Sequence, residues 1–154
     1  MLNSIKNKPF KILWWTIPIV FVISLIKWNY SVDIQMHDTY FVIALFHVGI
    51  LFILTLALIG GIYWLVRSKK LIDIFTIIHV TTTIILILVI MILFSRPEPD
   101  TTNMTLDSMN SDFESWKSWN QKILGGILAW TLSQLIFLVN LVTSLIRNEE
   151  NLNV

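Results

Sequence analysis

The sequence predicts an all-α fold, a four-helix transmembrane bundle, from its composition and from the length of its apolar stretches. Of the 154 residues, 55% are hydrophobic and 14% are charged, and the mean hydropathy is +0.73. Soluble domains carry about 45–50% apolar and about 25% charged residues, and a small domain buries only about two-thirds of its surface. Four apolar stretches reach or approach the roughly 20 residues that span a bilayer. The composition therefore excludes a soluble globular domain and a disordered chain.

The four helices are expected at about 10–28, 40–66, 74–94 and 123–146, within a single membrane domain that covers residues 1–154. The last three stretches contain no Lys, Arg, Asp or Glu. The first contains Pro18, which membrane helices tolerate better than soluble helices do. A cleaved signal peptide is the alternative for this first stretch, but the stretch is too long and no small-x-small cleavage site follows it.

Prolines and polar residues separate the third helix from the fourth. Pro97 and Pro99 are expected to end the third helix, and an exposed outer loop is expected over 97–115. Within this loop, residues 112–116 could begin the fourth helix early and lie along the membrane surface.

Lysine and arginine residues orient the bundle. Lys6, Lys8 and Lys11 lie before or at the start of the first helix, and Arg67, Lys69 and Lys70 lie between the second and the third. The connections at the other end are acidic. The positive-inside rule then places both termini in the cytoplasm, with a bacterial inner membrane as the expected location. Aromatic residues at the ends of the spans, among them Tyr63 and Trp64, are expected at the membrane interface.

Two further compositional facts exclude classes of function. The chain has no cysteine, so it can form no disulfide, no thiolate metal site and no covalent attachment of a c-type haem. Its net charge of +1 gives no electrostatic basis for binding nucleic acid. The lipid bilayer is therefore the expected surrounding partner.

Few residues inside the predicted spans can carry chemistry. Polar and ionisable side chains are costly in a bilayer, so they mark candidate sites. They are His47 in the second helix, His79 in the third, and Ser133, Gln134 and Asn140 in the fourth. The pair His37-Asp38 lies at the outer end of the second helix.

Each of these residues also has a structural interpretation. His47 can be neutral and hydrogen-bonded to a neighbouring helix, for example to Ser133 or Gln134. Asp38 or Thr39 can cap the second helix by accepting hydrogen bonds from its free N–H groups. Both interpretations need no metal and no cofactor.

The remaining polar and small residues are expected to serve helix packing. His79 lies beside three threonines, whose hydroxyls can bond within or between helices. Gly60-Gly61 and Gly125-Gly126 allow a close approach of helices, and Gly125 with Ala129 has a small-xxx-small spacing.

A longer motif surrounds His47. Residues 33–47, Asp-Ile-Gln-Met-His-Asp-Thr-Tyr-Phe-Val-Ile-Ala-Leu-Phe-His, resemble the tenth helix of subunit I of the haem–copper oxidases, whose signature is close to D-I-x-x-H-D-T-Y-[YF]-V-V-A-H-F-H. More weakly, 78–81 resembles the start of the eleventh helix of that family, and Trp119-Asn120 resembles the residues before the twelfth. The four spans together resemble only the last four helices of that subunit.

The resemblance implies roles for three positions, and it also shows which ligands of that family have no counterpart in this chain. The final histidine of the motif is an axial ligand of the low-spin haem in that family, and this position is His47. His37 and Asp38 match the pair beside the haem propionates and the magnesium site, so a metal contact is implied for them. The ligand of the high-spin haem falls on Leu45, which cannot bind iron. The copper ligands belong to helices that this chain lacks, so we expect no copper and no oxidase activity from the chain alone.

Three hypotheses follow, and the sequence leaves them open. The chain can be an accessory or partner protein of a respiratory complex, with haem b bound through His47 or with no haem. It can be a haem-free structural or assembly protein. It can be a small b-type cytochrome whose haem lies between the His47 residues of two associated protomers, because His47 and His79 are expected at different depths. A fragment of a split oxidase subunit, completed by another polypeptide, is a separate interpretation that the sequence also leaves open.

Overall fold

The computed structural model describes the backbone of residues 7–36, 39–69, 71–94 and 106–150. These residues form four helices, α2 (Pro9–Ile26), α3 (Leu45–Leu65), α4 (Asp73–Leu93) and α5 (Leu106–Glu150). Two strands, β1 (Ser31–Met36) and β2 (Thr39–Ala44), lie between α2 and α3. Each helix contains a segment long and apolar enough to cross a membrane, which in α5 is Lys117–Ile146. The chain is therefore a multi-pass membrane protein, as its composition predicted.

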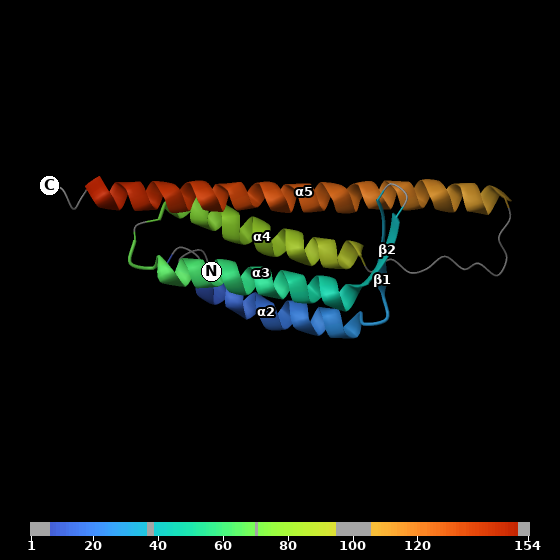
Figure 1. The fold of residues 1–154 in the computed structure, drawn as a ribbon, viewed down its shortest axis with the longest axis horizontal. Coiled ribbons are helices and arrows are strands. Elements are labelled where there is room, and N and C mark those ends of the chain that lie inside the picture. Colours follow the sequence, from blue (N-terminus) through green and yellow to red (C-terminus); the bar gives the residue numbers. More distant parts are fainter. Residues whose placement is uncertain (1–6, 37–38, 70, 95–105, 151–154) are drawn as a thin grey trace.

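The helices run back and forth along one common direction (Figure 1). Helix α2 packs along α3, α4 packs along α5, and α2 also contacts α4. The start of α2, the connection between α3 and α4, and the end of α5 all lie toward the same end of the bundle (Figure 1). The β-hairpin lies at the opposite end. An even number of crossings thus returns the chain to the side from which it enters.

The bundle is apolar on its inside and on its outside. In α3, Phe52, Leu56 and Ile59 are buried against the other helices. On the opposite face of the same helix, Leu51 and Leu54 are each 62% exposed. A helix that is hydrophobic all round needs either a large protein core or lipid around it. The outward leucines are accordingly the lipid-facing side of this small bundle.

The second helix begins later than the sequence predicted. Residues 40–44 were expected inside a helix at 40–66, but they belong to β2, which pairs antiparallel with β1, Ile34 opposite Phe41. The run Thr39–Ala44 is rich in β-branched and aromatic residues, which favour strands, and β1 is separated from it by two residues only. A short apolar run cannot be assigned to helix or strand by its periodicity alone. The fold is therefore mostly helical, with one hairpin, and not strictly all-α.

The capping interpretation is wrong for Thr39 because of this hairpin. Helix α3 begins at Leu45, its N-cap residue is Ala44, and no side chain caps it. Instead, the N–H of Leu45 donates a hydrogen bond of 2.9 Å to the carbonyl of Tyr30, which ties the start of α3 to the base of the hairpin. Asp38 lies outside the described residues.

The fourth helix is longer than predicted. The outer loop was expected to extend to residue 115, but α5 starts at Leu106 and continues without a break to Glu150. Residues 106–124 contain no proline or glycine, so nothing in the chain interrupts a helix there. Acidic residues near its start also favour a helix, since they face the positive end of its dipole. Residues 95–105 lie outside the described part of the chain.

Two of the four predicted close-approach glycines lie at helix contacts. A Cβ added to Gly60 would collide with the indole of Trp14, and one on Gly126 would lie 3.2 Å from Cγ1 of Ile90. Gly61 and Gly125 have open space around them. Ala129 is exposed like Gly125, so their small-xxx-small spacing does not mark a helix contact within the described chain.

Candidate functional site

His47 lies on the outer surface of the bundle, in the first turn of α3. Its imidazole is exposed and makes an edge contact with the ring of Phe46, with centroids 6.0 Å apart. Phe46 in turn contacts Trp28, which lies in the turn after α2. In the described part of the chain, no other histidine side chain is near this imidazole. His47 is therefore accessible to a group from outside the chain.

Leu45 points the other way. It is fully buried, whereas His47, two residues later, is exposed. Residues two apart on a helix face in nearly opposite directions, because each residue turns the helix by about 100°. The position that the resemblance assigns to a high-spin haem ligand is thus a core leucine, packed against the rest of the bundle.

The other predicted metal residues, His37 and Asp38, lie between β1 and β2 and outside the described residues. Within the described residues, no group of three or more His, Asp or Glu side chains is close enough to hold a metal ion. The structure therefore leaves the implied metal contact of His37-Asp38 as a prediction.

A buried network of side-chain hydrogen bonds connects three helices at the other end of the bundle. Tyr63 of α3 bonds Nδ1 of His79 of α4 at 3.0 Å, and Nε2 of His79 bonds Oε1 of Gln134 of α5 at 3.1 Å. His79 is fully buried, and Tyr63 is 1% exposed. Phe137 of α5 stacks on the imidazole, with centroids 5.0 Å apart and an angle of 23° between the planes. The imidazole is thus enclosed by its two hydrogen-bond partners and an aromatic ring.

The partners of Gln134 determine which atoms carry protons. Its amide nitrogen donates to the carbonyl of Trp130 at 3.1 Å and to Oγ of Ser133 at 3.0 Å, so its oxygen faces His79 as an acceptor. Nε2 of His79 must then donate, and Nδ1 is left to accept a hydrogen bond from the hydroxyl of Tyr63. A neutral imidazole therefore satisfies every hydrogen bond in this network.

A second polar contact joins α4 and α5, nearer the start of α4. Asn140 of α5 is fully buried; its oxygen accepts from the N–H of Ile72, and its nitrogen donates to Oγ1 of Thr76, both at 2.9 Å. Ile72 is the N-cap residue of α4, so Asn140 satisfies one of the free N–H groups at the start of that helix. The expected packing role of Asn140 is confirmed by these contacts.

The structure reassigns several of the sequence-based interpretations. Gln134 was considered as a partner of His47, but it bonds His79. Tyr63, which was expected at the inner end of its span, has its side chain buried between helices. Neither Tyr63 nor Phe137 was a candidate residue, and the only sequence signal for Tyr63 was that an aromatic hydroxyl lies within a charge-free span.

The described residues of one chain do not fit a haem held by two histidines. Both ring nitrogens of His79 are engaged in hydrogen bonds, and its ring is covered by Phe137. His79 lies at the level of Tyr63, which follows His47 on α3 by about 24 Å at roughly 1.5 Å per residue. A haem on His47 would need its second axial ligand from elsewhere.

Comparison with known proteins adds no relative. Neither a protein-family model, nor a curated protein, nor a solved structure matches this chain.

Proposed function

We propose that this multi-pass membrane protein is an accessory protein of a respiratory complex, which meets its partner through the hairpin and the adjoining start of α3. The motif at 33–47, which resembles haem–copper oxidase subunit I, falls on this hairpin and on the first turn of α3. The observation that carries the proposal is the exposure of His47 at the end of that motif. A residue that serves only the packing of its own chain has no reason to face outward.

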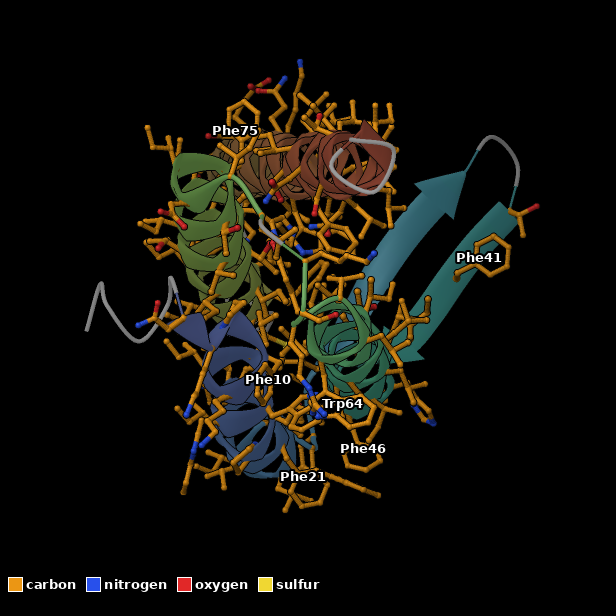
Figure 2. All side chains as sticks on the ribbon, turned by 90° about the vertical axis from the view of Figure 1, so that its left-hand side faces the viewer. Phe10, Phe21, Phe41, Phe46, Trp64 and Phe75 are labelled. Atoms are coloured by element: carbon orange, nitrogen blue, oxygen red, sulfur yellow. The ribbon has the colours of Figure 1, made fainter. Side chains whose placement is uncertain are left out.

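The surroundings of His47 support a contact with another protein. Phe41 and Val42 of β2 are 46% and 62% exposed, and the hairpin projects away from the helices with Phe41 on it (Figure 2). β1 and β2 form a two-stranded sheet. In a two-stranded sheet the outer edges of both strands have unpaired backbone groups, which favour contact with another chain. The hairpin and the first turn of α3, which carries His47, are thus the part of the chain that we propose to meet a partner.

Haem binding is part of this proposal only as a shared site. His47 would supply one axial ligand, and a second chain would supply the other: a respiratory subunit or a second copy of this protein. The second of these cases is the small b-type cytochrome. Where the partner contributes no ligand, the protein is an accessory protein without haem.

A haem-free structural or assembly protein is the second candidate function, and a specific observation favours it. Three polar residues inside the spans, His79, Gln134 and Asn140, join α3, α4 and α5 to one another. Such a pattern is typical of a scaffold that holds helices in fixed positions.

Purification in mild detergent from haem-replete membranes separates these functions. We expect respiratory subunits, identified by mass spectrometry, to co-purify with the wild-type chain and to be lost or reduced in His47→Ala. Leu51→Ala is the matched control, because Leu51 is exposed on the same face of α3 one turn further on. This control should retain the partner.

An optical spectrum of the same samples decides the haem question. A dithionite-reduced Soret and α band that disappears in His47→Ala, with no respiratory subunit present, would indicate the b-type cytochrome. A colourless preparation with co-purified subunits would indicate the haem-free accessory protein. A colourless preparation without such subunits would overturn the respiratory proposal and leave the structural protein.

A further inference from the structure

A cavity of about 330 Å³ opens at the end of the bundle opposite the hairpin. It is lined by residues from the start of α2, the end of α3, and the connection into α4. This is the end that faces the viewer in Figure 2, where Phe10 and Trp64 are labelled. Ligand sites in proteins have volumes of about 300–1,000 Å³, so a small polar group fits such a space.

The charges that line this cavity favour an anion. Arg67 and Lys69 contribute two cations, against the single carboxylate of Asp73. The guanidinium of Arg67 lies over the ring of Trp64, 4.7 Å from its centroid, which limits the orientations it can take. Arginine and lysine are the residues that proteins use most to bind phosphate oxygens. The volume and the excess of cations together favour a small anion such as a phosphate group.

The position of the cavity favours a phosphate that belongs to a lipid. The apolar helix α2 begins here and the apolar helix α3 ends here, and Trp64 and Leu65, the last two residues of α3, are 40% and 69% exposed. Tryptophan at the end of a span lies at the depth of the lipid headgroups. Phe10 and Leu71 add apolar wall to the cavity. A headgroup can therefore enter from the membrane while its acyl chains remain against the outer face of the helices.

We propose that this cavity binds the phosphate of an anionic phospholipid headgroup, of the phosphatidylglycerol class, through Arg67 and Lys69. Tyr63 also lines the cavity, and its hydroxyl belongs to the buried hydrogen-bond network with His79 and Gln134. A bound headgroup would thus contact the helix junction that this chain holds together. The proposal is independent of any partner protein and of haem.

Native mass spectrometry of the full chain in detergent tests this site. The protein is titrated with phosphatidylglycerol and with phosphatidylcholine of identical acyl chains. We expect preferential binding of one phosphatidylglycerol in the wild type. Because each cation near a membrane surface is worth roughly a fivefold change in lipid affinity, Arg67→Gln with Lys69→Gln should weaken binding by roughly 25-fold.

The control variant is Lys117→Gln with Lys122→Gln. Lys122 lies over the ring of Trp119, 5.6 Å from its centroid, so it repeats the cation and tryptophan pairing away from the cavity. This variant should bind phosphatidylglycerol as the wild type does. Arg67→Lys, which keeps the charge, should retain most of the preference, and gel filtration with circular dichroism checks the fold of each variant.

Three results would overturn the proposal. Equal binding of the two lipids by the wild type would remove the anion preference without recourse to any variant. An equal loss in the Lys117 and Lys122 variant would show that the effect is general electrostatics and not this cavity. Competition by inorganic phosphate at concentrations equal to those of the lipid would identify a site for free phosphate.

Discussion

The two histidines of the described chain have opposite environments, and this difference determines what each can do. His79 is enclosed, with both nitrogens bonded and Phe137 stacked on its ring. His47 is exposed, with an edge contact to Phe46. A buried imidazole with satisfied bonds holds helices together, whereas an exposed one is available to a ligand or a partner. The chemistry of the residue type is the same in both places.

Removal of the Tyr63 hydroxyl tests how much the buried hydrogen-bond network contributes to stability. In Tyr63→Phe, Nδ1 of His79 loses the donor that satisfies it, and the site is too enclosed to provide another. Interhelical hydrogen bonds in membrane proteins contribute about 0.6 kcal/mol on average and up to about 1.7 kcal/mol. We expect the free energy of unfolding in mixed micelles to fall by about 1 kcal/mol.

Tyr30→Phe is the control for this measurement. The ring of Tyr30 lies under the ammonium of Lys27, 4.6 Å from the ring centroid, and phenylalanine keeps that ring in place. Its effect on the free energy of unfolding should be near zero. A similar loss in both variants would mean that the bond between Tyr63 and His79 contributes nothing specific.

At the scale of elements, the hairpin and the long last helix are the features that hydropathy did not resolve. β2 and α3 are both mostly apolar, and the chain changes from strand to helix between Ala44 and Leu45 without a glycine or proline. The change is decided by pairing: β2 has β1 beside it, and α3 has α2. The hydropathy of an apolar run by itself reveals neither of these contacts.

The register of the hairpin can be tested by cross-linking, because the chain has no native cysteine. Ile34 and Phe41 are directly opposite one another in the two strands. Opposed residues in antiparallel strands have Cα atoms about 4.5–5.5 Å apart, which is within the range of a disulfide. We expect Ile34→Cys with Phe41→Cys to form an intramolecular disulfide on mild oxidation, detected by mass spectrometry after proteolysis.

The matched pair is Ile34→Cys with Val42→Cys. Val42 pairs with Asp33, and its side chain belongs to the other face of the hairpin relative to its neighbour Phe41. This pair should remain reduced under the same conditions. Efficient cross-linking of the second pair and not the first would mean that the strands are shifted by one residue.

At the scale of the whole molecule, the two ends of a bundle that spans a membrane face different compartments. The start of α2, the connection between α3 and α4, and the end of α5 share one end. The basic residues Arg67 and Lys69 lie in that connection, so the positive-inside rule predicts that this end is cytoplasmic. The hairpin with His47 would then lie toward the outer side.

Single cysteines test this orientation. Ser68 is exposed in the connection between α3 and α4, so Ser68→Cys should be protected from a membrane-impermeant maleimide in intact cells. Asn103→Cys, at a position outside the described residues, should be labelled from outside. The reverse labelling pattern would overturn the predicted orientation, and labelling of both after cell lysis controls for reactivity.

The candidate site was predictable only in part, for reasons that particular residues make clear. His47 could be found because it ends a recognisable motif, but nothing in the sequence states that it faces outward. His79 was visible as a polar residue in a span, and its partners could not be named. They are Tyr63 and Gln134, which lie 16 and 55 residues away along the chain. Contacts between such distant residues follow from the angles at which helices pack.

The sequence by itself determined that the chain is a membrane protein with four segments long and apolar enough to span the bilayer. Hydropathy is a sum over neighbouring residues, so local composition is enough to decide it. Only the tertiary structure decided that 39–44 is a strand, that Tyr63 is buried, and that His79 is enclosed while His47 is exposed. These properties depend on what lies beside a residue in space. In a bundle that is apolar inside and outside, the hydropathy of a residue does not say which way it faces.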